Sequence, residues 1–195
     1  MRRKPLLMAA AVLAATLAGS TGQVAAWEAA PSESNGCAPG AEVPSFYVRE
    51  VTSRRPNLAI CLVCRYGARP VVLLCVRELN DEVGQLIERV DRAVDAGRGV
   101  GLRGFAIFTE GENAELQPQL ATLARQRKTT LPLALPVERG GPSTMQLPQD
   151  ADVTILLYRD KKVAERYVFA PGELTERRIE QVVSAALYTA FAEGR

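Results

Sequence analysis

The chain has 195 residues, of which 47% are hydrophobic, 6% aromatic and 24% charged, a composition typical of a globular protein of one domain and not of a disordered or multi-pass membrane protein. Its formal charge is +2, but Arg2, Arg3 and Lys4 stand at the start, and the remaining 21 basic and 22 acidic residues argue against binding to nucleic acid. The chain has no histidine, which excludes Ser-His-Asp and Cys-His catalytic systems and most mixed-ligand metal sites.

The first 26 residues have the three parts of a secretory signal. A basic start is followed by an apolar run from Leu6 to Ala18 and by small residues that end at Ala26. Because this run is too short to span a bilayer comfortably, we expect a cleaved signal at 1–26, no integral membrane segment after its removal, and a periplasmic or secreted product. Residues 27–55 show no sustained period and are predicted to be a mobile N-terminal segment before a domain at 56–195.

The domain begins with a predicted strand and helix. Residues 70–76 form a continuous apolar run rich in β-branched side chains, which predicts a strand buried on both faces of a sheet. Residues 80–96 carry apolar side chains at steps of three and four, which predicts an amphipathic helix. Asn80 or Asp81 is expected to cap this helix by accepting a hydrogen bond from one of its first amides.

A second strand and helix follow, and then a short strand. Residues 105–108 are predicted to be an apolar strand, and a helix is expected to begin near Gln117, because Pro118 is tolerated in a first turn. This repeated order of strand and helix predicts parallel strands. Residues 131–136 are predicted to be a short strand near an edge of the sheet, because prolines bracket it.

The last third of the chain is predicted to hold a β-hairpin and a helix. The hairpin joins residues 153–158 to 163–169 through a polar turn. Thr175 is expected to cap the final helix, with Leu174 packing against Ile179 near its start. The expected buried stripe of this helix is Ile179, Val182, Val183, Ala186, Leu187 and Phe191.

This order of elements resembles the thioredoxin fold, and the short strand at 131–136 is similar to the peroxiredoxin and cytochrome-maturation branch of that superfamily. The resemblance covers about residues 70–191. Its most specific stretches are 153–163, similar to the family's Pro-Thr-hydrophobic strand and Lys-Asn-Gly-like turn, and 171–174, similar to the start of its last helix. The resemblance implies an α/β fold, a thioredoxin-like three-layer sandwich with a central mixed β-sheet and helices on both faces.

The sequence departs from the family pattern at the usual catalytic site. Redox-active members carry a Cys-x-x-Cys pair or a single cysteine at the start of the helix after the first central strand, and here Asn80, Asp81 and Glu82 stand there. The family's cis-proline would stand just before Thr154, where this chain has Val153. The resemblance therefore implies that the usual catalytic site is absent. We interpret the two carboxylates as favourable partners of a helix start.

The Cys61-Leu62-Val63-Cys64 motif precedes the first central strand instead of following it. Three interpretations of this pair stay open: a disulfide that holds the chain before the sheet, a displaced redox-active pair, and a metal site, which would need two further ligands. Arg65 and Arg69 lie nearby in the sequence and would favour a thiolate. Tyr66 is interpreted either as part of a contact surface or as a ring packed under a loop.

Two further cysteines lie outside this motif. Cys75 falls within a predicted strand, where a buried free thiol is the expected state. Cys37 falls in the segment predicted to be mobile, so it could pair with Cys61 or Cys64, exchange with either, bond another chain, or serve as a third, resolving thiol.

The sequence therefore predicts an exported thioredoxin-like domain without the usual catalytic site, which serves as a disulfide-stapled binding or scaffold module for an unknown protein partner. No cofactor, metal or nucleic acid is expected. The alternative is a thiol-disulfide oxidoreductase that uses Cys61 and Cys64, with Arg65 and Arg69 lowering the pKa of the attacking thiol. A peroxidase would need a lone activated cysteine, and the strand position of Cys75 disfavours it.

Overall fold

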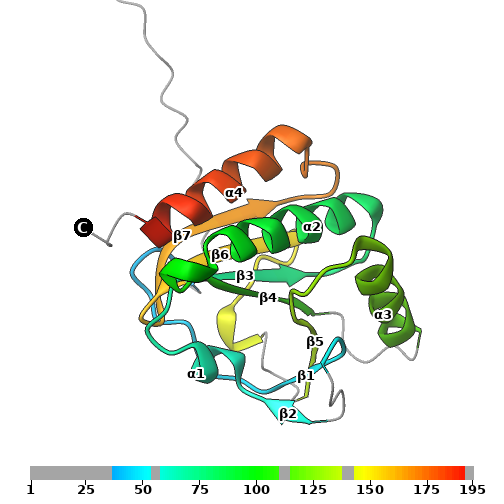
Figure 1. Cartoon of the computed structure of the whole chain (residues 1–195), viewed down its shortest axis with the longest axis horizontal. Coiled ribbons are helices and arrows are strands. Elements are labelled where there is room, and N and C mark those ends of the chain that lie inside the picture. Colours follow the sequence, from blue (N-terminus) through cyan, green and yellow to red (C-terminus); the bar gives the residue numbers. More distant parts are fainter. Residues whose placement is uncertain (1–36, 54–57, 110–114, 138–142, 192–195) are drawn as a thin grey trace, which may run out of the picture. The chain divides into compact units, whose positions relative to one another are not determined.

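The computed structural model describes residues 37–53, 58–109, 115–137 and 143–191, and its centre is a seven-stranded mixed β-sheet (Figure 1). The strands lie in the order β2-β1-β5-β4-β3-β6-β7. Their bounds are β1 Val48–Glu50, β2 Ala59–Ile60, β3 Val71–Val76, β4 Arg103–Phe108, β5 Leu133–Pro136, β6 Val153–Arg159 and β7 Lys162–Phe169. The helices are α1 Leu62–Tyr66, α2 Asp81–Ala96, α3 Leu116–Arg127 and α4 Glu176–Phe191, with 3₁₀ turns η1 Arg98–Val100 and η2 Ser143–Met145. The expected signal at 1–26 lies outside the described residues.

The predicted elements of the domain are present. The Oδ1 atom of Asn80 accepts a hydrogen bond from the amide of Val83 at 2.8 Å, so Asn80 is the cap of α2. Helix α3 begins at Leu116, which places Pro118 in its first turn. Within the described residues, no helix combines the length and the apolar character needed to cross a membrane.

The centre of the sheet is parallel and its hairpin side is antiparallel. Strand β3 pairs in parallel with β4 and antiparallel with β6, and β4 pairs in parallel with β5. Asp160 and Lys161 join β6 to β7 with φ angles of 50° and 60°, the left-handed conformation that two-residue hairpin turns of type I′ require. This topology is the mixed sheet that the sequence predicted.

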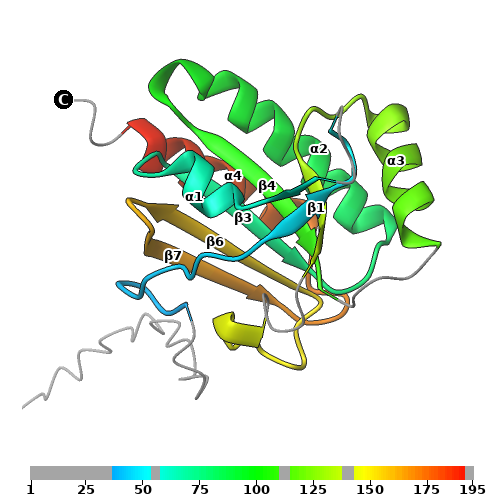
Figure 2. The same cartoon turned by 90° about the horizontal axis from the view of Figure 1, so that it is seen from below.

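Helices cover both faces of the sheet, which gives the predicted three layers (Figure 2). Val72, Leu74 and Val76 of β3 belong to a buried cluster that includes side chains of α2, α3 and α4. The alternate residues of the same strand belong to a second buried cluster, formed with α1, η2 and residues 37–48. Because successive side chains of a strand point to opposite faces, the continuous apolar run of β3 serves both layers.

The N-terminal side of the domain corrects two predictions. Strand β5 is not at an edge, because β1 pairs with it on the side away from β4. Residues 37–53 are part of the fold, although the sequence placed them in a mobile segment, since Val43 and Val48 are fully buried. A strand of three residues is too short to show an alternating pattern, so its pairing could be found only in the tertiary structure.

The buried stripe of α4 also differs from its prediction at the end of the helix. Ile179, Val182 and Ala186 are buried as expected, but Phe191 is 50% exposed and Ala190 is buried in its place. Residue 190 lies four positions after residue 186 and therefore on the same side of the helix. The last buried side chain of α4 is therefore the small side chain of Ala190.

Candidate functional site

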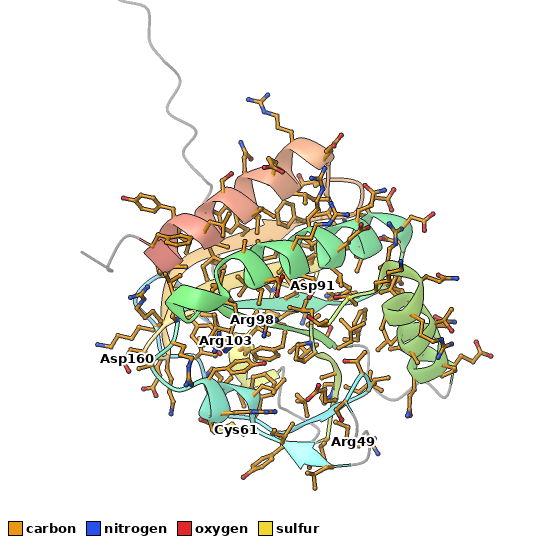
Figure 3. All side chains as sticks on the ribbon, viewed as in Figure 1. Arg49, Cys61, Asp91, Arg98, Arg103 and Asp160 are labelled. Carbon is orange, nitrogen blue, oxygen red and sulfur yellow. A yellow bond between two sulfur atoms is a disulfide. The ribbon has the colours of Figure 1, made fainter. Side chains whose placement is uncertain are left out.

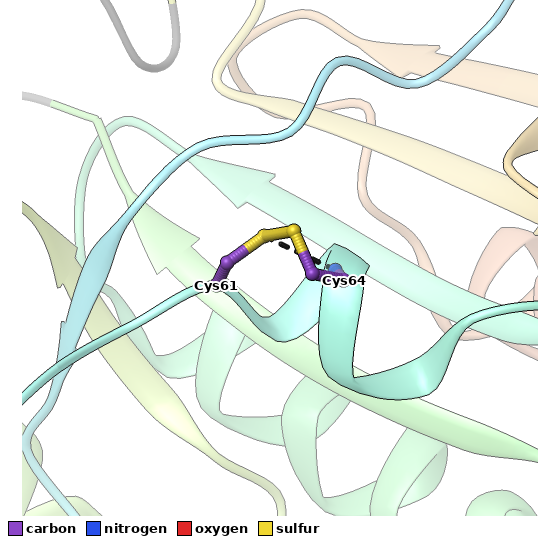
Figure 4. The surroundings of a disulfide bond; sticks show 2 residues. All are labelled: Cys61 and Cys64. Carbon is purple, nitrogen blue, oxygen red and sulfur yellow. Dashed lines mark hydrogen bonds between the residues drawn. A yellow bond between two sulfur atoms is a disulfide. The ribbon is translucent and has the colours of Figure 1, made fainter.

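A disulfide joins Cys61 to Cys64 at the start of α1 (Figure 4). Cys61 is the residue before the helix, and its Sγ atom accepts a hydrogen bond from the backbone amide of Cys64 at 3.1 Å. The chain leaves α1 through a turn at Gly67, which has a φ of 60°, and then begins β3. The disulfide therefore precedes the first central strand, as the sequence order requires.

The two cysteines of this bond differ in their exposure to solvent. Cys61 is 7% exposed and belongs to the second buried cluster, whereas Cys64 is exposed. Leu62 and Val63, between them, are fully buried and hold α1 against the sheet. An incoming thiol therefore has access to the Cys64 side of the bond, while the Cys61 side faces the core.

Cys37 and Cys75 are free thiols that lie in the same buried cluster as Cys61. Burial raises the pKa of the Cys37 thiol, against a smaller opposing effect of Arg166, and burial raises the pKa of Cys75 still more strongly. The Sγ of Cys75 lies 4.0 Å from the sulfur of Met145. The prediction of a buried thiol at Cys75 is confirmed, and Cys37 forms no bridge to Cys61 or Cys64 in this structure.

Arg65, Tyr66 and Arg69 lie together on α1 and the turn that follows it. Both arginines are exposed, and an Nη1 hydrogen of Arg69 bonds to the carbonyl of Tyr66 at 3.2 Å. The ring of Tyr66 packs against Phe105 with centroids 5.9 Å apart, and its hydroxyl donates to the carbonyl of Gly104 at 3.5 Å. Tyr66 is thus a packed ring, and any effect of the two arginines on the thiols stays a prediction.

The same three residues line one wall of a polar pocket of about 420 Å³. Its remaining charged side chains are Glu50, Asp91, Arg98 and Arg103. Sequence reasoning missed these four, because they come from β1, α2, η1 and β4 and no local spacing connects them.

The described residues contain no group of three or more Cys, Asp or Glu side chains placed to hold a metal ion. The sequence had left a metal site at the Cys61 and Cys64 pair as one interpretation. In the structure these two sulfur atoms bond to each other, so they are not available as thiolate ligands in this state.

Comparison with known proteins identifies the architecture. No protein-family model and no curated protein sequence matches the chain. Among solved structures, the peroxidoxin BcpB of Mycobacterium tuberculosis is similar with a TM-score of 0.62 at 17% identity, over 80% of this chain and 98% of the other. A secreted disulfide oxidoreductase of M. tuberculosis, homologous to DsbE of E. coli, is similar with a TM-score of 0.54 at 8% identity, over 72% of this chain and 95% of the other. The chain has a thioredoxin-like fold.

The start of α2, where the resemblance predicts the fold family's catalytic thiol, carries no cysteine. Asn80 caps α2 at that position, and Asp81 and Glu82 lie exposed in the first turn. Val153 stands at the start of β6, and all peptide bonds of the described residues are trans. The Cys61–Cys64 disulfide lies before β3 in the chain order, whereas α2 follows β3.

Proposed function

We propose that this thioredoxin-like protein exchanges disulfides and thiols with a partner protein through Cys61 and Cys64. The observation that carries the proposal is the asymmetry of the bond, which links an exposed Cys64 to a buried Cys61. A disulfide-exchange protein needs one sulfur that a partner thiolate can reach and a second sulfur that serves as the leaving group. This is the alternative that the sequence analysis kept open.

The exchange begins with the oxidised pair. A thiolate of the partner attacks the Sγ of Cys64, a bond forms between these two sulfurs, and the bond between Cys64 and Cys61 breaks. Cys61 leaves as a thiolate, which the amide of Cys64 stabilises by the hydrogen bond described above. A second thiolate of the partner then attacks the partner's own sulfur and releases Cys64 as a thiolate. The partner is oxidised by two electrons and the pair is reduced by two.

The size of the ring also favours exchange over a purely structural bond. The disulfide closes a loop between residues three apart in the sequence. By chain-entropy arithmetic a loop this short stabilises a fold by about 2 kcal/mol, against about 4.7 kcal/mol for a loop of 100 residues. A disulfide between distant segments would be the more effective staple, and none links the described parts of the chain.

A binding or scaffold module is the second candidate. It is favoured by the carboxylates of Asp81 and Glu82 at the start of α2, where the fold family's catalytic thiol is expected. In this function the disulfide holds the start of α1 and an unknown protein partner binds elsewhere. Both candidates include the predicted export to a periplasmic or secreted location, where oxidising conditions keep such a bond closed.

A redox titration separates the two candidates. The protein is equilibrated with glutathione mixtures and dithiothreitol, free thiols are alkylated, and each cysteine is quantified by mass spectrometry. If the protein exchanges disulfides, the Cys61 and Cys64 pair should titrate between about −120 and −270 mV, the range of known exchange catalysts. A bond that stays closed below about −300 mV would contradict exchange and support the scaffold.

A further inference from the structure

The polar pocket beside α1 is built from segments that are far apart in the sequence. Its walls come from α1 and the turn after it, the C-terminal half of α2, η1, the start of β4 and the residues before β5. Figure 3 shows Arg98 and Arg103 between α1 and α2, with Asp91 on α2 beside them. Its volume of about 420 Å³ is in the range of pockets that hold small molecules.

The charged side chains of this pocket are unbalanced. Four arginines, Arg65, Arg69, Arg98 and Arg103, face two carboxylates, which leaves a net charge of +2. Asp91 is already engaged, because its two oxygens accept hydrogen bonds from the amide and the hydroxyl of Thr130 at 3.0 to 3.2 Å. The second carboxylate, Glu50, lies near Arg65, but burial raises its pKa more than that arginine lowers it. The pocket is therefore electropositive.

Three of the four arginines are held by contacts that leave part of the guanidinium available. Nη1 of Arg103 donates to the carbonyl of Leu102 at 2.8 Å, and Nη1 of Arg69 donates to the carbonyl of Tyr66 at 3.2 Å. Nε of Arg98 pairs with Asp95 at 3.2 Å. A guanidinium has five N–H donors, and these contacts engage one atom of each group. Ordered arginines with remaining donors are suited to bind oxyanions by paired hydrogen bonds.

Three of these arginines interact electrostatically with one hydroxyl group in the pocket wall, that of Tyr66. Burial and the carboxylate of Glu50 raise the pKa of the Tyr66 hydroxyl, and Arg65, Arg103 and Arg98 each oppose that rise. Their charges therefore converge on the same hydroxyl, although they come from α1, β4 and η1. Convergence of positive charge from separate elements is the arrangement expected of an anion site.

We propose that this pocket binds a small dianion whose phosphate or paired carboxylate oxygens are held by Arg65, Arg69, Arg98 and Arg103. A ligand of charge −2 matches the net charge of the lining, and the separate guanidinium groups supply several donors to its oxygens. This inference goes beyond the exchange function and does not depend on it, because no cysteine lines the pocket.

Isothermal titration calorimetry on the oxidised protein tests the proposal. Inorganic phosphate and succinate are titrated separately, at an ionic strength held constant with sodium chloride. We expect saturable binding of at least one dianion with a stoichiometry of one. Arg69→Gln and Arg98→Gln each remove one charged donor group from an exposed position and should weaken the binding constant at least tenfold. Arg125→Gln, which removes an exposed arginine of α3 outside the pocket, should change it less than twofold.

The outcomes are distinct. Binding of phosphate alone, or of succinate alone, supports the site and identifies the class of its ligand. Absence of saturable binding of both at about 10 mM, or an equal loss in Arg125→Gln and Arg98→Gln, would overturn the proposal. Repeating the titration with Cys61→Ala/Cys64→Ala separates the two hypotheses, since loss of the redox pair should leave anion binding intact.

Discussion

Cys64 lies exposed at the surface while Cys61, to which its sulfur is bonded, keeps only 7% of its surface exposed. The two residues are also joined by the hydrogen bond from the amide of Cys64 to the sulfur of Cys61. This asymmetry predicts a difference in reactivity between them. Leu62 and Val63, which anchor the short helix in the core, maintain that difference.

The single variants Cys61→Ala and Cys64→Ala should differ in the reactivity of the thiol that remains. In Cys61→Ala the remaining Cys64 is exposed, and we expect it to react with a maleimide at least ten times faster than the buried Cys61 that remains in Cys64→Ala. Reaction rates at pH 8, followed by intact-protein mass spectrometry, measure the ratio. Equal rates, or a faster Cys61, would show that the exposed sulfur is not the point of attack.

Cys37 and Cys75 should be unreactive in the folded protein. Burial raises the pKa of both thiols, so at pH 8 each forms less of the thiolate that reacts with iodoacetamide than an exposed cysteine does. We expect modification of both only after denaturation with urea. Peptide mass spectrometry with and without urea checks this, and modification of Cys37 in native conditions would contradict its burial.

Two glycines near the start of β4 offer a matched test of packing. A Cβ added at Gly104 would lie 2.9 Å from a methyl of Val94 and 3.0 Å from a methyl of Leu131, whereas a Cβ at Gly99 would meet nothing within 4 Å. Gly104→Ala should therefore lower the free energy of unfolding by about 1 to 3 kcal/mol. Gly99→Ala should change it by less than about 0.5 kcal/mol. Urea denaturation of both variants measures the difference, and equal stability would contradict the packing.

Glu88 should make a pH-dependent contribution to stability. Its carboxylate accepts a hydrogen bond from Arg127 of α3 at 3.0 Å and also pairs with Arg92, and these contacts lower its pKa. A lowered folded-state pKa stabilises the fold above the unfolded value of about 4.3, and this contribution is lost as the pH falls through the folded value. Glu88→Gln should therefore reduce stability by a few tenths of a kcal/mol at pH 7.

The pH dependence supplies the check on this ion pair. The difference in free energy of unfolding between wild type and Glu88→Gln should shrink as the pH is lowered from 6 to 3. Glu180→Gln on α4 is the control, because Glu180 is exposed and makes no ion pair within the described residues. A difference that is independent of pH would mean that the ion pair between α2 and α3 contributes nothing.

The central elements were predictable from sequence because the burial of each one is visible in the pattern of apolar residues within its own segment. The apolar run of 70–76 required a strand buried on both faces, and the periodicity of 80–96 required an amphipathic helix with a polar cap at Asn80. The absence of a thiol at the start of that helix could also be read directly. The sequence alone therefore determined the order of the central elements, the burial of Cys75 and the absence of a thiol at the start of α2.

The tertiary structure decided the remaining features, because they depend on contacts between segments that share no local pattern. The pairing of Val48 with Pro136 moves β5 away from the edge. The backbone amides of Gly40 and Val43 bond to the carbonyls of Val163 and Lys161, next to the buried Cys37. The four arginines of the polar pocket meet only because α1 packs beside the end of α2 and the start of β4. A short strand and single charged residues leave no periodic signal, so their positions follow from the packing of the whole sheet.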